Sequence, residues 1–277
     1  MNAAELTIVI LIGAAIAGFL GSLTGLGGGV VIVPLLTLAF HVNIRYAIGA
    51  SLVSVIATSS GAAAAYVREG FSNIRIGMFL EIATTSGALV GAFVALKLHV
   101  SVIAVIFGIV LLYSSYISLN PPHVAPDEKP DKLAARLRLS GEYPTPNGQQ
   151  SYHATGVPQG FSVMFGAGML SGILGLGGGA VKVLALDRAM RLPFKVSTAT
   201  SNFMIGVTAA ASAGVYLNRG YIDPALAMPV MLGVLGGSLI GARMLAGANV
   251  KLLRIIFAIV IAFLGVEMIF NGLTGRI

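Results

Sequence analysis

The apolar segments of the sequence contain few ionisable residues, and Lys182 is the one best placed to bind a ligand. It lies three residues after Gly179, the last residue of a glycine-rich stretch that interrupts an apolar segment. A lysine beside a break in a helix can attract an anion, and the free N–H groups at the start of the next helix act in the same direction. The alternative is a side chain that extends to the cytoplasmic interface near Asp187. The sequence favours neither interpretation over the other.

Two glutamates also lie in apolar segments, where an ionisable group must be either satisfied or functional. Glu81 is inside its predicted helix, which makes it a candidate for proton coupling. Glu267 is near the end of the last predicted helix, where an interfacial position is expected.

Small polar side chains follow each glycine-rich stretch on the next predicted helix. In the first half, Ser51, Ser54 and Thr58 recur at spacings of three and four residues and therefore share one helical face. The second half has a similar stripe. Such groups can replace the hydration shell of a small ion, although serine and threonine also bond the carbonyls of their own helix. The predicted substrate ligands among them are Ser51, Ser54, Thr198, Ser201 and Asn202.

The glycine-rich stretch occurs twice, as Gly-Leu-Gly-Gly-Gly at residues 25–29 and 175–179. Glycine costs roughly 1 kcal/mol relative to alanine inside a helix, so four glycines in five positions predict a break. Irregular backbone at membrane depth is tolerated only where protein buries it or a wet cavity borders it, so we expect both breaks at one polar site. The alternative is close helix packing of the GxxxG type. The glycines predicted to contact substrate are Gly25, Gly27, Gly28, Gly29, Gly175, Gly177, Gly178 and Gly179.

The composition indicates a polytopic membrane protein. Of 277 residues, 56% are hydrophobic and 10% are charged, and the mean hydropathy is +0.92. The absence of cysteine excludes a thiolate metal site and a cysteine nucleophile, and the four histidines are scattered, so we expect no metal and no cofactor. No histidine lies in an apolar segment and no Gly-x-Ser-x-Gly sequence occurs, so we predict no catalytic residue and no enzyme.

The two halves align without a gap at an offset of 150 residues, over about 70 residues. The resulting division is a first membrane repeat at 1–119, a linker at 120–157 and a second repeat at 158–277. The predicted apolar segments are 6–24, 28–40, 46–67, 74–96, 100–119, 158–174, 177–190, 195–217, 222–246 and 250–271. The second segment of each half is too short to span a membrane. We predict an all-α helical bundle with short discontinuous helices at the glycine stretches.

Five segments per half is an odd number, which predicts that the repeats are inverted relative to each other. If the linker is cytoplasmic, twelve lysines and arginines lie on the cytoplasmic side of the membrane and four lie on the other side. This asymmetry agrees with the positive-inside rule.

The linker holds six of the 11 prolines, and its eight charged residues sum to zero. This composition predicts a solvated cytoplasmic connector that buries no core, with a short amphipathic helix over residues 131–139.

The glycine pair, the Val33-Pro34 dipeptide and the run from Lys195 to Asn202 resemble the TauE/SafE family of sulfite exporters over both membrane halves. The resemblance implies a secondary transporter, here an exporter, of small sulfur-containing anions such as sulfite or organosulfonates. It also implies the cytoplasmic (inner) membrane of a prokaryote, with the lipid bilayer and a small anion as partners. The second half departs from the family in having Val183-Leu184 and Lys182, which leaves the substrate open. An anion channel, an uptake permease for another small organic anion, and a homodimer remain alternatives; nucleic acid is not expected as a partner.

Overall fold

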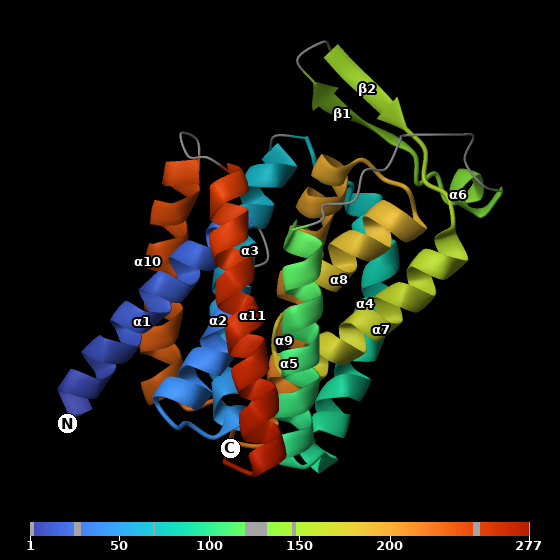
Figure 1. Cartoon of the computed structure of the whole chain (residues 1–277). Helices are drawn as coiled ribbons and strands as arrows, with labels where there is room; N and C mark the ends of the chain where they lie inside the picture. The colour runs from blue at the N-terminus through green and yellow to red at the C-terminus, as the bar shows by residue number, and fades with distance from the viewer. Residues whose placement is uncertain are drawn as a thin grey trace.

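The computed structural model describes residues 3–24, 29–68, 70–119, 132–145, 148–245 and 250–276, which form the helical bundle of Figure 1. The all-α fold class is therefore confirmed. The helices of the first half are α1 (Ala3–Thr24), α2 (Gly29–Pro34), the π-helical turn η1 (Leu35–Ala39), α3 (Ile44–Arg68), α4 (Ile74–Lys97) and α5 (Val100–Leu119). Those of the second half are α7 (Val157–Leu174), α8 (Gly179–Leu184), the π-helical turn η2 (Ala185–Ala189), α9 (Phe194–Asn218), α10 (Pro224–Leu245) and α11 (Val250–Thr274).

Among the described helices, α4, α5 and α7 are long and apolar enough to cross a membrane. Shorter apolar stretches lie within α1, α2 with η1, α3, α10 and α11. Large apolar side chains also cover outward faces; on α11, for example, Ile259, Phe263 and Phe270 are each more than half exposed. An outer surface of this kind is suited to lipid.

The second segment of each half is short, as the sequence predicts. α2 and η1 together span 11 residues, and α8 and η2 span another 11. At 1.5 Å per residue each pair is about 16 Å long, roughly half the hydrocarbon core.

Equivalent contacts hold the two halves together. α1 packs along α10, and α7 packs along α4. A Cβ atom at Gly87 would collide with the carbonyl oxygen of Phe165, and one at Gly237 would collide with that of Ala15. Both residues of the second contact are offset by 150 from those of the first. Gly87 and Gly237 therefore allow the paired helices to pack closely.

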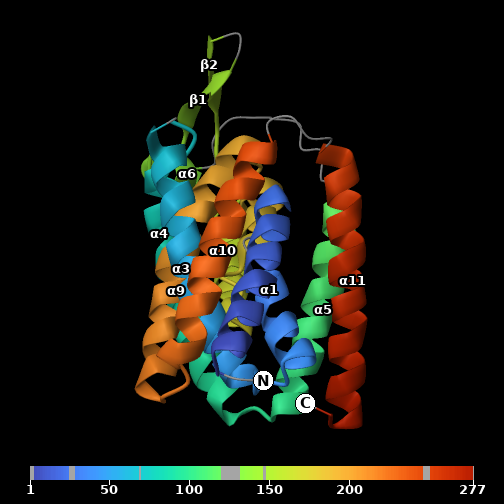
Figure 2. The same ribbon diagram turned by 90° about the vertical axis from the view of Figure 1, so that its left-hand side faces the viewer.

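The two chain termini lie at one end of the bundle, and the linker elements lie at the other (Figures 1 and 2). α1 begins at the end with the termini, whereas α7 begins at the end with the linker elements (Figure 1).

The described part of the linker is more ordered than its composition predicts. It contains α6 (Lys132–Arg136), where a short helix is expected, and also strands β1 (Gly141–Thr145) and β2 (Gly148–Tyr152), which the sequence did not predict. The strands form an antiparallel hairpin in which Gly141 pairs with Tyr152.

The expectation that this segment buries no core is wrong for its second part. Leu139, Tyr152 and Ala154 are buried in one apolar cluster with Ile76 of α4 and Met190. The side-chain amide of Asn73 donates to the Tyr152 hydroxyl at 2.7 Å and to the Leu139 carbonyl at 3.3 Å. The linker is polar on average, so its composition does not reveal these few apolar side chains. They are spaced so that they contact the ends of α4 and η2.

Candidate functional site

Lys182 lies on α8 and is fully buried, with 0% of its surface exposed. Its ammonium nitrogen donates to the hydroxyl of Thr208 at 2.5 Å and to the carbonyl oxygen of Met204 at 3.2 Å. Both partners belong to α9. The side chain therefore points into the bundle, and the interpretation that it extends to the interface does not hold for this conformation.

Glu81 on α4 approaches the same point from the other side. Its Oε1 atom accepts hydrogen bonds from the hydroxyls of Thr208 at 2.7 Å and Thr85 at 2.8 Å. Its Oε2 atom is buried and has no hydrogen-bond partner among the described residues. Thr208 thus stands between Lys182 and Glu81, and the three residues join helices α8, α9 and α4.

The hydroxyl of Thr208 has a choice of acceptors. Besides Glu81 Oε1, the Met204 carbonyl oxygen lies 2.9 Å from it. A hydroxyl carries one proton, and an ionised carboxylate is the stronger acceptor, so we assign that proton to Glu81 while Glu81 is charged. The ammonium group of Lys182 then binds a lone pair of the same oxygen.

The second glycine stretch forms the turn that brings Lys182 into the bundle. Gly175, Gly177 and Gly178 have φ angles of +69°, +67° and +70°, a region that side-chain-bearing residues rarely adopt. A Cβ atom at Gly178 would lie 3.2 Å from the Ser171 side chain and 3.6 Å from Cε of Lys182. The left-handed backbone and the close approach to Ser171 therefore favour glycine at this position, whereas the lysine stem would be at ordinary contact distance.

The two glycine stretches meet. A Cβ atom at Gly29 would lie 3.4 Å from the carbonyl oxygen of Gly175. Ser51 of α3 joins them, since its hydroxyl donates to Gly175 O at 2.9 Å and lies 3.5 Å from Gly29 O. Gly25, Gly27 and Gly28, which are also predicted to contact substrate, lie outside the described residues.

The remaining predicted ligands divide into two groups. Ser201 lies beside the glycine turn, with its hydroxyl 3.4 Å from Gly179 O, whereas the Ser54 hydroxyl donates to the Ser51 carbonyl of its own helix. Asn202 donates to the Thr198 carbonyl at 3.0 Å. Ser54 and Asn202 therefore make the local bonds that need no substrate.

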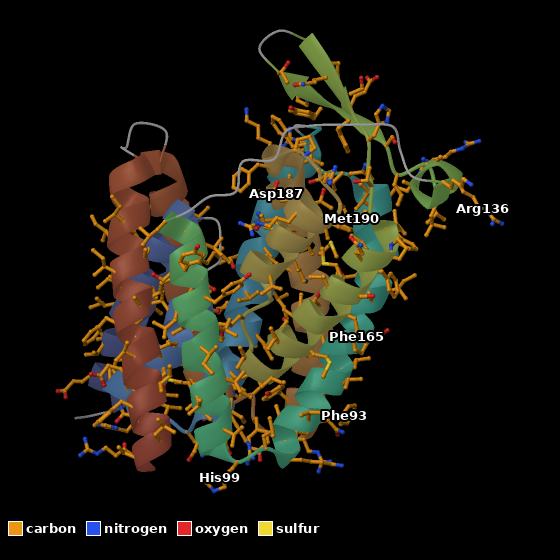
Figure 3. All side chains as sticks on the ribbon, turned by 45° about the vertical axis from the view of Figure 1, so that its right-hand side comes forward. Phe93, His99, Arg136, Phe165, Asp187 and Met190 are labelled. Atoms are coloured by element: carbon orange, nitrogen blue, oxygen red, sulfur yellow. The ribbon has the colours of Figure 1, made fainter. Side chains whose placement is uncertain are left out.

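Thr198 lines a separate opening of about 300 Å³ together with Phe71, Phe194 and Lys195. The Lys195 ammonium lies 5.8 Å from the centre of the Phe71 ring. Because these residues belong to the first turns of α9 and the loop before α4, the opening lies at the end of the bundle that carries the linker. Figure 3 shows Asp187 and Met190 at that same end.

Sequence reasoning did not select Thr208, Thr85 or Ser171 as site residues. Ser171 is fully buried, its hydroxyl has no hydrogen-bond partner among the described residues, and it lines a cavity of about 20 Å³ with Gly178 and Gly179. A cavity of that size holds roughly one water molecule. The 150-residue offset, which pairs Thr208 with Thr58, was a signal that could have selected Thr208.

The two charges of the cluster come from different halves, and neither is repeated in the other half. At the 150-residue offset, Lys182 corresponds to Ile32 and Glu81 corresponds to Met231. The structure therefore combines two similar frameworks with a pair of opposite charges that the 150-residue offset does not repeat.

The sequence profile described as Sulfite exporter TauE/SafE matches residues 10–268. The chain belongs to the TauE/SafE family. A protein of Bacillus subtilis named "Probable membrane transporter protein YunE" is 30% identical over 275 residues, which cover 96% of this chain and 98% of the relative. The "Probable membrane transporter protein MJ0441" of Methanocaldococcus jannaschii is 26% identical over 284 residues, covering 95% of each chain. No solved structure matches this chain.

The names of these TauE/SafE relatives describe membrane transporters and not enzymes. The chain is accordingly a membrane transporter with a small-molecule substrate. The relatives' names do not state which substrate they carry.

Proposed function

We propose that this protein is a secondary transporter that exports small sulfur-containing anions, such as sulfite or organosulfonates, across the cytoplasmic membrane of a prokaryote. The family supports the sulfur-containing substrate. The observation that carries an anionic substrate is the burial of Lys182 at a glycine turn that joins α7 to α8. A buried ammonium group is costly without a negative partner; Glu81 reaches Lys182 only through the Thr208 hydroxyl, and a bound oxyanion can contact the ammonium group directly.

The proposed site combines this charge with polar groups from both halves. The glycine turns let the substrate approach the backbone, Lys182 supplies charge, and hydroxyl and amide groups serve as neutral ligands. The residues proposed for substrate are Gly25, Gly27, Gly28, Gly29, Ser51, Ser54, Gly175, Gly177, Gly178, Gly179, Lys182, Thr198, Ser201 and Asn202. Since Ser54 and Asn202 bond backbone carbonyls in this conformation, they must change partners before they contact an anion.

The two halves are proposed to be inverted repeats that rock against each other around this site, with the linker in the cytoplasm. The equivalent contacts of Gly87 and Gly237 support a two-fold relation between the halves. The start of α1 and the start of α7 at opposite ends of the bundle support the inversion (Figure 1).

The experiment that tests this function is flux through purified protein in proteoliposomes, measured in turn with sulfite, sulfate, thiosulfate and a taurine-like sulfonate. We expect saturable transport of at least one of the sulfonate or sulfite substrates. Current proportional to driving force without saturation would instead indicate an anion channel. Transport of other organic anions in preference to all four would contradict the sulfur-containing substrate.

A further inference from the structure

We propose that the transported anion replaces Glu81 as the counter-ion of Lys182. When the anion binds, Glu81 takes up a proton. The proposal rests on the proposed function, because it requires an anionic substrate at Lys182. It predicts that one monovalent anion and one proton cross the membrane together.

The first argument is the balance of charge in a buried place. Lys182 is fully buried and Glu81 is 9% exposed, and the Thr208 hydroxyl connects them. In the conformation observed, one positive and one negative charge face each other. An anion that enters the site would place two negative charges beside one ammonium group. Two negative charges close together in a poorly hydrated site disfavour the ionised form of the carboxyl group. Protonation of Glu81 restores the balance.

The second argument is the hydrogen bonding of the cluster, which can accommodate either state. With Glu81 ionised, Thr208 donates to its Oε1 atom at 2.7 Å. With Glu81 protonated, the Thr208 proton has the Met204 carbonyl as an alternative acceptor at 2.9 Å. Rotation of one hydroxyl then changes the hydrogen-bond partner without movement of the helices.

The third argument is that one carboxylate oxygen has no partner. Oε2 of Glu81 is buried and has no hydrogen bond among the described residues, whereas Oε1 accepts two. A buried carboxylate oxygen without a donor is costly, and a proton bound there removes the charge that causes the cost. We therefore place the proton on Oε2.

Other titratable groups do not face Glu81 from the elements packed on α4. α7 contains no Asp, Glu, Lys, Arg or His, and the titratable residues of α9 are Lys195 in its first turn and Tyr216 near its end. Tyr216 bonds to the carbonyl of Gly172, away from the cluster. On α4 itself, Arg75 and Lys97 occupy the two ends of the helix. Lys182 is thus the charged partner of Glu81 in the described part of the chain.

Methanesulfonate is a suitable probe because it stays monovalent over the whole experimental pH range, so any proton movement comes from the protein. Proteoliposomes with a pH-sensitive dye inside receive an inward methanesulfonate gradient, with the membrane potential held at zero. We expect the parent protein to acidify the interior by about one proton per anion, and its methanesulfonate affinity to rise up to about tenfold for each unit by which pH falls in the coupled range. Glu81→Gln should carry the anion without the proton, and its flux should respond to membrane potential.

Glu267→Gln is the matched control, because it changes a carboxylate to an amide on α11, where Glu267 bonds to Asn271. It should couple like the parent. Methanesulfonate flux in the parent without proton movement would overturn the coupling and leave the proposed function standing, and this outcome needs no variant. Proton movement that persists in Glu81→Gln would also overturn it. Absence of saturable flux and binding for every sulfur-containing anion would contradict both proposals.

Discussion

The ammonium nitrogen of Lys182 lies 2.5 Å from the hydroxyl oxygen of Thr208, about four turns along α9 from the end at which that helix begins. This contact decides between the two interpretations of Lys182, a side chain that extends to the interface and a cation inside the bundle. A lysine that reaches the membrane interface contributes little to a binding site, whereas one bonded inside the bundle holds a charge where water is scarce. The glycine turn before α8 makes the second arrangement possible.

Gly178→Leu should abolish transport while the protein still inserts. The new side chain would have to adopt φ near +70° and would meet the Ala167 carbonyl, the Ser171 side chain and the stem of Lys182. Gly166→Leu, on α7, is the control because a Cβ atom there meets nothing within 4 Å. Flux in proteoliposomes at equal protein content is the measurement. Normal transport by the Gly178 variant would show that the turn is only a spacer.

Gly237→Ala should destabilise the protein, since its Cβ atom would collide with the Ala15 carbonyl and force α1 and α10 apart. We expect a loss of about 1–3 kcal/mol, the usual range for overpacking. Gly236→Ala is next to it on the same helix, and a Cβ atom there meets nothing within 4 Å. Thermal unfolding in detergent compares the two. Equal stability of both variants would show that the helix contact does not limit stability.

Asn73→Ala should release the linker from the bundle. It removes the hydrogen bonds to Tyr152 and Leu139 and also the N-terminal cap of α4, where Asn73 accepts from the Ile76 N–H group. We expect faster trypsin cleavage after Arg138, which is exposed. Asn218→Ala, at the exposed end of α9, is the control. An unchanged cleavage rate would show that the apolar contacts alone hold the linker.

High pH should weaken the same contact. Burial raises the pKa of the Tyr152 hydroxyl, and the hydrogen bond from Asn73 opposes this with a smaller effect. A group whose pKa is raised in the packed state stabilises that state below its ordinary pKa and loses this contribution as pH rises above it. Trypsin cleavage after Arg138 should therefore accelerate, relative to a free peptide, above about pH 10. The Tyr152→Phe variant should show no such acceleration.

Labelling of single cysteines tests the orientation, because the chain has no cysteine of its own. Ser151→Cys lies on the exposed linker hairpin, and Asn218→Cys lies at the opposite end of the bundle. In intact cells, a membrane-impermeant reagent should label Asn218→Cys and not Ser151→Cys. External labelling of Ser151→Cys would contradict a cytoplasmic linker.

Much of the fold could be predicted because glycine, proline and charge interrupt the apolar segments at defined places. The segment predicted at 158–174 is α7 at Val157–Leu174, and the short segment at 177–190 is α8 with η2 at Gly179–Ala189. Helix ends are local properties of the sequence. The β hairpin was missed because its strands are polar on average, and its buried side chains pack only against distant parts of the chain.

The site could be predicted only in part. Lys182 and Glu81 stood out because each is an ionisable residue in an apolar segment, yet a separation of about a hundred residues concealed the contact between them. Only the packing of α9 against α4 and α8 brings Thr208 between the two charges. Conversely, the polar stripe of α9 has two parts in the structure. Ser201 lies at the glycine turn, whereas Thr198 lines the opening near the linker.

The most direct test of the central claim is the equilibrium binding of sulfite and methanesulfonate to purified Lys182→Gln protein. If Lys182 is the counter-charge of the anion, affinity should fall at least tenfold, which corresponds to about 1.4 kcal/mol. Lys182→Arg should keep part of the affinity, and Lys97→Gln at the exposed end of α4 should keep all of it. Lys182→Gln alone leaves the Glu81 carboxylate without its counter-ion. The double variant Lys182→Gln with Glu81→Gln removes that carboxylate, so a lower affinity of the double variant cannot be attributed to misfolding. Parental affinity in Lys182→Gln would show that the anion binds elsewhere and would contradict this account.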